Sequence, residues 1–189
     1  MNVRSVLALT ALTVGTALAT APAAHAGDFE CRGTLGAVTV VGSVIVPDDA
    51  TCVLDGTSVQ GSVVVKSRAT LRATGITMTG TVAGEGPGTV DVRSSSIGNG
   101  FSVTKGESVG SVSLASSSVT GDVSLADNRG AVELRGNEVG GSIQANKNTG
   151  GLTISANRIV NGLQCQDNFP APTGGGNIAA QKQGQCVAL

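Results

Sequence analysis

Hydrophobic residues recur along the chain in short alternating runs, and these runs repeat at a regular interval. Each unit opens with an aliphatic residue, carries Gly or Asn two positions later, and continues with two alternating apolar positions. The openings, with successive spacings of 19, 19, 19, 22, 20, 20 and 20, fall at Val40, Val59, Met78, Ile97, Val119, Val139, Ile159 and, weakly, Ala179. Alternation with a period of two is typical of a strand with one buried face, so the chain reads as an array of short β units.

Two apolar columns run through the repeat. The first holds Val44, Val63, Val82, Phe101, Val123, Ile143 and Leu163. After a loop of variable length, a second alternating pair follows, and its later member is Leu54, Ala73, Val92, Leu114, Leu134 or Ile154. We therefore expect two continuous inward stacks, one containing Val63, Val123, Ile143 and Leu163 and the other containing Val92, Leu114, Leu134 and Ile154.

The position two residues after each opening is restricted to two residue types. It reads Gly42, Gly61, Gly80, Asn99, Gly121, Gly141 and Asn161. Glycine and asparagine accept a positive φ more readily than other residues. The column predicts a structural corner with positive φ that is turned at the same place in every coil.

These features define the expected fold class. Each unit is too short for a helical repeat, and its Val, Ile, Thr, Ser and Gly content favours strands. The sequence predicts an all-β, single-domain parallel β-helix, a solenoid that is right-handed and three-sided, with about seven coils of 19 to 22 residues. Its stability would come mainly from contacts between neighbouring coils.

Residues 1–26 have the organisation of an export signal. Arg4 forms a basic start, Val6 to Leu18 are largely apolar, and Ala24-His25-Ala26 matches a small-x-small cleavage pattern. We expect residues 1–26 to be a cleaved signal peptide and residues 27–189 to form the β-helix. The apolar stretch is shorter than the roughly 20 residues that span a bilayer, so no membrane insertion is expected.

Composition narrows the possible functions. Without Arg4, the expected mature chain has eleven basic and thirteen acidic side chains, which gives no electrostatic attraction to nucleic acid. The only histidine, His25, lies in the expected signal, which removes the commonest general base and metal ligand at neutral pH. We therefore expect no cofactor, no metal and no catalytic residues.

Four cysteines in an exported chain suggest two disulfides. Cys31 and Cys52 have the same spacing as Cys165 and Cys186, and this spacing is close to the length of one coil. Neighbouring coils bring Cα atoms within disulfide range. The sequence predicts Cys31–Cys52 and Cys165–Cys186 bonds that tie an N-terminal cap (27–52) and a C-terminal cap (165–189). A tetrahedral metal site is the alternative, but there is no Cys-x-x-Cys motif.

Asparagines also recur at a spacing of one coil. One column contains Asn128, Asn148 and Asn168, and another contains Asn137, Asn157 and Asn177. They could form a polar binding stripe on the surface. They could also form internal or corner ladders of side-chain amides, an interpretation that their position next to turns favours.

Few residues are candidates for ligand chemistry. Outward positions bring Asp91 near Arg93 and Glu133 near Arg135, which predicts ion pairs between coils. Asp127-Asn128 and Asp167-Asn168 could contact calcium, but the glycine-rich nonapeptide of calcium-binding β-rolls is missing. Thr77-Met78-Thr79-Gly80-Thr81 is similar to an ice-binding motif, but it does not recur in neighbouring coils. Tyr and Trp, which commonly stack on sugars, are absent.

The glycine-punctuated runs Val59-Gln60-Gly61-Ser62-Val63-Val64-Val65 and Val139-Gly140-Gly141-Ser142-Ile143 resemble the bactofilin-like class of small parallel β-helices. The segment from Gly162-Leu163-Gln164-Cys165 through Asn168-Phe169-Pro170-Ala171-Pro172 to Gln185-Cys186 is similar to the ending of uncharacterised secreted actinobacterial β-helix repeat proteins. The first resemblance implies end-to-end polymerisation in the cytoplasm, whereas the signal and the four cysteines indicate export.

Together these observations predict a secreted, non-catalytic structural or surface-interaction protein of the cell envelope or extracellular milieu. The alternative is a polysaccharide-binding or polysaccharide-modifying β-helix module. The expected partner is an envelope protein or a polysaccharide. We expect a monomer, because Pro170 and Pro172 interrupt the last coil, Gly174-Gly175-Gly176 lets the chain reverse, and Cys186 ties the tail back.

Overall fold

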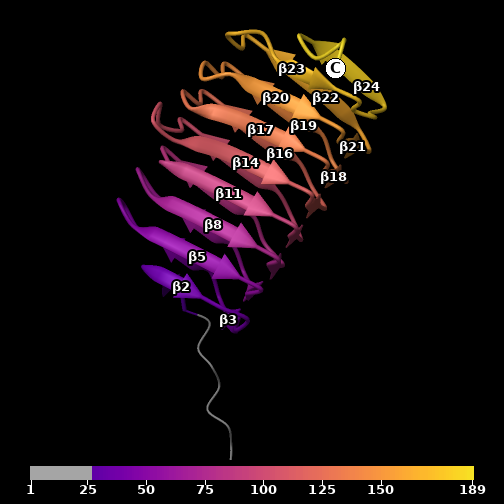
Figure 1. Cartoon of the computed structure of the whole chain (residues 1–189). Helices are drawn as coiled ribbons and strands as arrows, with labels where there is room; N and C mark the ends of the chain where they lie inside the picture. Colours follow the sequence, from indigo (N-terminus) through magenta and orange to yellow (C-terminus); the bar gives the residue numbers. More distant parts are fainter. Residues whose placement is uncertain (1–26) are drawn as a thin grey trace, which may run out of the picture.

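The computed structural model describes residues 27–189, and these residues form a three-sided parallel β-helix (Figure 1). They contain strands, turns and bends but no helix. All strand pairs within the three sheets are parallel, and each strand pairs with its equivalents in the coils before and after it. The fold class predicted from the repeat is therefore confirmed. The expected signal peptide, residues 1–26, lies outside the described residues.

Sheet A has nine strands, which are, in spatial order, β1 (Phe29–Glu30), β4 (Val44–Val46), β7 (Val63–Val65), β10 (Val82–Glu85), β13 (Phe101–Thr104), β16 (Val123–Ala126), β19 (Ile143–Asn146), β22 (Gly162–Gln166) and β24 (Gln181–Gly184). Sheet B has eight strands, which are β2 (Gly33–Leu35), β5 (Thr51–Asp55), β8 (Thr70–Thr74), β11 (Thr89–Arg93), β14 (Ser111–Ala115), β17 (Ala131–Arg135), β20 (Leu152–Ser155) and β23 (Thr173–Gly175).

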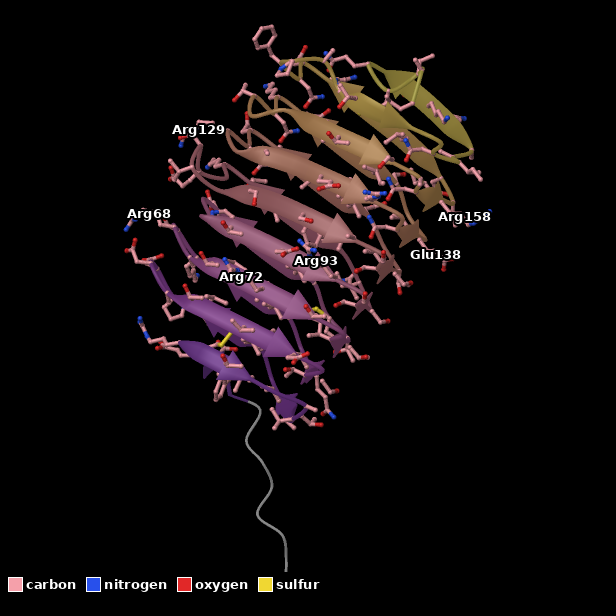
Figure 2. All side chains as sticks on the ribbon, viewed as in Figure 1. Arg68, Arg72, Arg93, Arg129, Glu138 and Arg158 are labelled. Carbon is pink, nitrogen blue, oxygen red and sulfur yellow. A yellow bond between two sulfur atoms is a disulfide. The ribbon has the colours of Figure 1, made fainter. Side chains whose placement is uncertain are left out.

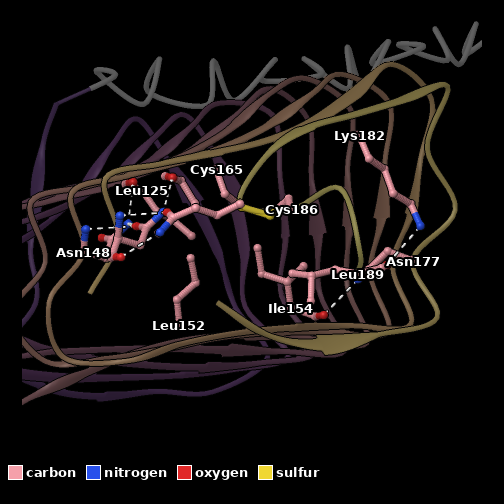
Figure 3. The surroundings of a disulfide bond; sticks show 12 residues. Leu125, Asn148, Leu152, Ile154, Cys165, Asn177, Lys182, Cys186 and Leu189 are labelled. Carbon is pink, nitrogen blue, oxygen red and sulfur yellow. Dashed lines mark hydrogen bonds between the residues drawn. A yellow bond between two sulfur atoms is a disulfide. The ribbon is translucent and has the colours of Figure 1, made fainter. Parts of the chain in front are cut away.

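Sheet C is the narrowest of the three and has seven strands, which are β3 (Thr39–Val41), β6 (Ser58–Gln60), β9 (Thr77–Met78), β12 (Ser96–Ile97), β15 (Ser118–Val119), β18 (Glu138–Val139) and β21 (Arg158–Ile159). The chain passes from sheet C to sheet A, then to sheet B, and back to sheet C. It advances along the rod in the right-handed sense (Figures 1 and 3).

The rod has about eight turns, one more than predicted. The extra turn arises from β23 and β24, which pair with β20 and β22. The glycine run at 174–176 was expected to reverse the chain, and this prediction is wrong. Gly174 and Gly175 instead continue sheet B as part of β23, with φ values of 124° and 147°. Glycine tolerates these angles because it has no Cβ.

The core is the interior of the coil, and the predicted inward stacks are both present. Val63, Val123, Ile143 and Leu163 have no exposed side-chain surface, and neither do Val92, Leu114, Leu134 and Ile154. Val123 pairs in register with Ile143, and Ile143 pairs with Leu163. Phe101 fills the same column and is also fully buried. Each coil therefore stacks like side chains on like, which is the packing that a short apolar repeat requires.

Candidate functional site

The outer face of sheet B forms a hollow on the described surface. It has a volume of about 860 Å³ and is lined by residues from six successive coils, including Arg72, Asp91, Arg93, Ser113, Glu133 and Thr153. Pro170 and Ala171 border it at the C-terminal end. Arg72 and Arg93 lie on this face, whereas Arg68 and Arg129 project from one edge of it and Glu138 and Arg158 from the other (Figure 2).

The ion pair on this face differs from the predicted one. Arg93 Nε lies 2.8 Å from Asp91 Oδ1, but both residues belong to β11, so the pair lies within one strand and does not link coils. This bond and the charge of Asp91 raise the pKa of Arg93. Among residues 27–189, Glu133 and Arg135 form no ion pair with each other. The exposed face therefore keeps charged groups that are free to meet a ligand.

A second charged feature, which the sequence analysis missed, runs along the turn from sheet A to sheet B. Successive coils place alternating charges there, at Asp49, Arg68, Glu85, Lys105, Asp127, Lys147 and Asp167. Arg68 donates to both carboxylate oxygens of Asp49, with N–O distances of 2.6 and 2.7 Å, and Lys105 Nζ lies 2.8 Å from Glu85 Oε1. We call these seven residues the alternating charge row.

Hydrogen-bonded neighbours in the alternating charge row shift each other's pKa values. The hydrogen bond from Arg68 lowers the pKa of Asp49, and the hydrogen bond from Lys105 lowers the pKa of Glu85. In turn, Glu85 raises the pKa of Lys105. All of these groups are exposed, so solvent and salt screen the pairs strongly. Opposite charges on successive coils also avoid the repulsion that like charges would create in a parallel stack.

The asparagine columns lie inside the coil and form ladders. Asn128 and Asn148 are completely buried, and Asn168 is 4% exposed. Asn148 Oδ1 accepts hydrogen bonds from the main-chain N–H and the side-chain amide of Asn128, and Asn168 Oδ1 does the same for Asn148. Each amide also donates to the main chain, as Asn148 Nδ2 does to Leu125 O at 3.1 Å. The columns are therefore internal ladders and not a surface binding stripe.

The second ladder contains serines as well as asparagines. Asn137, Asn157 and Asn177 are buried and bonded in the same way between sheets B and C. Ser117 and Ser95 continue the column, because Ser117 N–H donates to Asn137 Oδ1 and Ser95 N–H donates to Ser117 Oγ. Ile76 N–H then donates to Ser95 Oγ. The coil between Ile97 and Val119 is longer than the others, and this hides the alignment in the sequence.

The glycine and asparagine corner lies between sheets C and A, and its predicted conformation is wrong. Gly42 has a φ of 112°, but Gly61, Gly80, Asn99, Gly121, Gly141 and Asn161 have no positive φ. The restriction has a steric origin at the glycines. A Cβ on Gly121 would lie 2.8 Å from Asn99 O, and a Cβ on Gly61 would collide with Gly42 O. Close approach between coils, and not the backbone angle, favours glycine at these positions.

Positive φ occurs instead at the two turns that flank sheet B. The turn before sheet B has it at Asp49, Arg68, Gly86, Lys105, Asp127, Lys147 and Asp167. The turn after sheet B has it at Gly56, Gly75, Ser94, Ser116, Gly136, Ala156 and Gly176. Most of these residues are not glycine, so residue type alone does not reveal the turns.

Hydroxyl groups form a third ladder beside the glycine corner. Ser62 N–H donates to Ser43 Oγ, Thr81 N–H donates to Ser62 Oγ, and Gly100 N–H donates to Thr81 Oγ1. The row resumes at Asp122, whose Oδ1 accepts from Ser142 N–H at 2.7 Å. These side chains satisfy main-chain groups where the coil turns from sheet C to sheet A, so they are structural.

Both predicted disulfides are present, one at each end of the rod. Cys31 is bonded to Cys52 and Cys165 to Cys186, with Cα–Cα distances of 5.5 and 5.2 Å. Residues 27–189 contain no free cysteine. The four sulfurs are paired in disulfides, so they are not available as ligands for the alternative four-cysteine metal site.

The C-terminal segment closes its end of the rod (Figure 3). Gln185 Oε1 accepts hydrogen bonds from Asn168 N–H and from the Asn168 side-chain amide, and so it terminates the first asparagine ladder. Lys182 occupies the inward column above Leu163, and its Nζ donates to the main-chain oxygen of Leu189 at 3.0 Å. Leu189 is 8% exposed and Cys186 is fully buried. Polar groups and a small apolar plug therefore cover the last coil.

The remaining candidate residues do not converge on a site. Asn128 Oδ1 accepts a hydrogen bond from Gly106 N–H, and Asn168 Oδ1 accepts one from the Asn148 side-chain amide. These oxygens are therefore not placed beside Asp127 and Asp167 as calcium ligands. Phe29 and Phe169 are 42% and 77% exposed but lie near opposite ends of the rod. Thr77 and Thr79 lie on the outer face of sheet C. The equivalent residues in the next coil are Ser96 and Gly98, so the pair of threonines does not repeat.

Comparisons with protein-family models, curated proteins and solved structures find no match to this chain. Within residues 27–189, no helix is long and apolar enough to cross a membrane. The two disulfides are compatible with an extracellular, oxidising environment. What can be concluded about the function must therefore come from the surface of the rod.

Proposed function

We propose that the protein is exported and acts as a non-catalytic structural or surface-interaction protein of the cell envelope or extracellular milieu. The observation that supports this proposal best is the placement of the two disulfides. Each links adjacent coils at one end of the rod, where an open β-helix has unpaired strand edges. Such bonds persist in oxidising compartments and hold the ends of a rigid scaffold against fraying.

The internal ladders support the same role. They use many polar side chains to fix neighbouring coils and leave those side chains inaccessible to ligands. The charged residues that line the hollow on sheet B lie on the open outer face of the sheet and not in a buried site. A stiff rod with mixed surface charges suits a scaffold or an adhesive module.

Export and oxidation can be tested together in the native host. The chain would carry a C-terminal epitope tag, and cytoplasm, membrane, envelope and medium would be separated after rapid thiol alkylation. We expect the tagged protein in the envelope or medium, with its amino terminus at Gly27 and no alkylated cysteine. A cytoplasmic protein that retains residues 1–26 and has four alkylated cysteines would contradict the proposal.

A polysaccharide-binding module is the second candidate, and the hollow on sheet B favours it. Arg72, Asp91, Arg93, Glu133 and Thr153 present charges and a hydroxyl along several coils, which suits an extended polymer. Affinity electrophoresis in gels that contain polygalacturonate would test this function. Binding that is lost in Arg72→Ala, but kept in Arg158→Ala on sheet C, would support it. Equal migration of all variants with and without the polymer would exclude this ligand.

A further inference from the structure

Four glutamines gather on the outer face of sheet A at its C-terminal end. Gln144, Gln164 and Gln183 belong to β19, β22 and β24, and they pair in register with one another. Gln181 pairs with Gly162 in the same part of the sheet. We call Gln144, Gln164, Gln181 and Gln183 the glutamine cluster. Together with Ser142 and Asn161 it lines a hollow of about 360 Å³ that has no charged residue in its lining.

The hydrogen bonding of this cluster differs from that of the internal ladders. Inside the coil, each stacked asparagine amide is bonded to the next. In the cluster, one bond joins two members, from Gln183 Nε2 to Gln181 Oε1 at 3.0 Å. Within the described residues, the Gln144 and Gln164 amides form no hydrogen bond with protein groups. Each therefore offers two N–H donors and a carbonyl acceptor to a ligand.

The glutamines are confined to the last three coils of their column. The equivalent outward positions in earlier coils are Glu30, Ile45, Val64, Ala83, Ser102 and Ser124. Gly162 makes room within the cluster, because a Cβ there would meet nothing closer than Gln181 O at 3.9 Å. The hollow thus combines a local change in residue type with a gap in the layer of side chains.

The backbone beneath the cluster is firmly held. Ile143, Ala145, Leu163 and Cys165 lie behind it on the inner face of the sheet and are fully buried. The Cys165–Cys186 disulfide lies in the same coils as β22 and β24. A ligand would therefore meet strands already in place, which reduces the entropy lost on binding.

We propose that the glutamine cluster binds an uncharged saccharide. An amide can donate to one sugar hydroxyl and accept from the next, and amides on successive strands repeat at about 4.8 Å, along which a saccharide chain can lie. The lining has no charge to balance an ionic ligand. Without an aromatic platform a single contact would be weak, so affinity would grow with the number of sugar units engaged.

A polypeptide is the less favoured occupant. A partner strand that adds to a sheet uses the main-chain groups along the outer edge of a terminal strand, such as β24. The glutamine side chains point out of the plane of the sheet, and Gln144 and Gln164 belong to β19 and β22, which lie inside the sheet and not at its edge. Their amides are thus placed for a ligand that lies on the face of the sheet.

The test is isothermal titration of oxidised protein, residues 27–189, with cellohexaose and with chitohexaose. We expect at least one of them to bind with a dissociation constant below about 1 mM. The variant Gln144→Ala/Gln164→Ala should weaken that binding at least tenfold. The control Ser102→Ala/Ser124→Ala changes the same column outside the cluster, and it should bind as the unmodified protein does. Thermal unfolding of each variant would show whether the fold is retained.

Three results would overturn the proposal. These are no heat of binding with either sugar at millimolar concentration, equal affinity in the double glutamine variant, and stronger binding of hexagalacturonate or hexaglutamine than of both neutral sugars. The cluster lies on sheet A, away from the hollow on sheet B. A failed titration would therefore leave the proposed export and scaffold role untouched, because that role is tested by fractionation and thiol trapping.

Discussion

Asn148 Oδ1 accepts two hydrogen bonds from Asn128 in the preceding coil, one from its main-chain N–H at 3.2 Å and one from its side-chain amide at 2.9 Å. Both residues are completely buried. A single side-chain oxygen therefore satisfies two donors that have no access to water. This relationship repeats along both ladders and makes each rung depend on the next.

The variant Asn148→Leu should lower the free energy of unfolding by at least about 3 kcal/mol, because each buried polar group left without a partner costs roughly 1–3 kcal/mol. Chemical denaturation would measure the change. Asn146→Ala is the matched control in the same coil. Within the described part of the chain, the Asn146 side-chain oxygen has no hydrogen-bond partner, so its removal should change stability by less than about 0.5 kcal/mol. Similar losses in the two variants would contradict the ladder as the source of stability.

A second set of glycines is essential at the start of sheet B. Gly88, Gly110, Gly130 and Gly150 lie in successive coils, and a Cβ on Gly110 would collide with the carbonyl oxygen of Gly88. We expect Gly110→Ala to destabilise the protein by about 2 kcal/mol or more, because the coils must separate to admit the methyl group. Gly36→Ala is the control, since a Cβ there meets no atom within 4 Å. Equal melting temperatures for both variants would rule out close coil packing at Gly110.

The disulfides should contribute to stability separately at the two ends. Each closes a segment with a sequence separation of 21, and a loop of this size contributes on the order of 3 kcal/mol. Non-reducing peptide mapping should recover Cys31 linked to Cys52 and Cys165 linked to Cys186. Cys31→Ser/Cys52→Ser and Cys165→Ser/Cys186→Ser should each lower the melting temperature. A peptide that joins the two ends would refute this pairing.

The alternating charge row predicts a weak acid dependence of stability. The hydrogen bond from Arg68 lowers the pKa of Asp49 in the folded protein below its ordinary value of 3.8. Because the folded pKa is the lower one, the pair stabilises the fold above the ordinary pKa, and this contribution disappears as the pH falls through the folded pKa. The effect is small, since both side chains are exposed.

Unfolding of the unmodified protein and of Asp49→Asn should therefore be compared between pH 7 and pH 2 at low salt. The unmodified protein should be the more stable of the two at pH 7, and the difference should vanish at the acidic end. Added salt should reduce the difference at pH 7. A difference that persists unchanged at low pH would show that Asp49 acts through something other than its charge.

Features that recur at a constant interval along the chain could be predicted from the sequence. Features whose interval changes from coil to coil could not. The inward stacks around Ile143 and the Cys31–Cys52 pair follow from alternation and spacing, because one coil separates stacked residues. Ser95 and Ser117 were missed as ladder members because the longer interval between Ile97 and Val119 shifts the alignment. The glycine corner was located correctly but explained wrongly, since glycine can serve either backbone angle or close approach.

The surface sites were harder to predict for the same reason. The alternating charge row includes Glu85, which lies one residue before the aligned column, and the coil loops between its members differ in length. The glutamine cluster includes Gln183 only because β24 adds a further coil after Pro170 and Pro172. After the prolines, the weak unit opening at Ala179 is the sign in the repeat that the strand order resumes.

The two ends of the rod differ, and this difference predicts the assembly state. Leu189, Lys182 and Gln185 cover the C-terminal coil. At the N-terminal end Phe29, Val38 and Val41 are 42%, 49% and 39% exposed, and β2 has a free edge. If two copies associate through their N-terminal ends, both outer ends of the resulting dimer are covered C-terminal ends. Association would therefore stop at the dimer. We therefore expect light scattering from the oxidised protein to show monomers, or dimers at high concentration, but no longer species.

Removal of the C-terminal cover should change that outcome. A variant that ends at Phe169 and carries Cys165→Ser would expose β20 and β22, the strands that β23 and β24 pair with. Free edges at both ends would permit open-ended stacking, because every added copy would present a new edge. Negative-stain microscopy should show extended rods for this variant. The full chain with Cys165→Ser/Cys186→Ser controls for loss of the disulfide alone. If the shortened variant remains monomeric, the C-terminal cover is not what limits assembly.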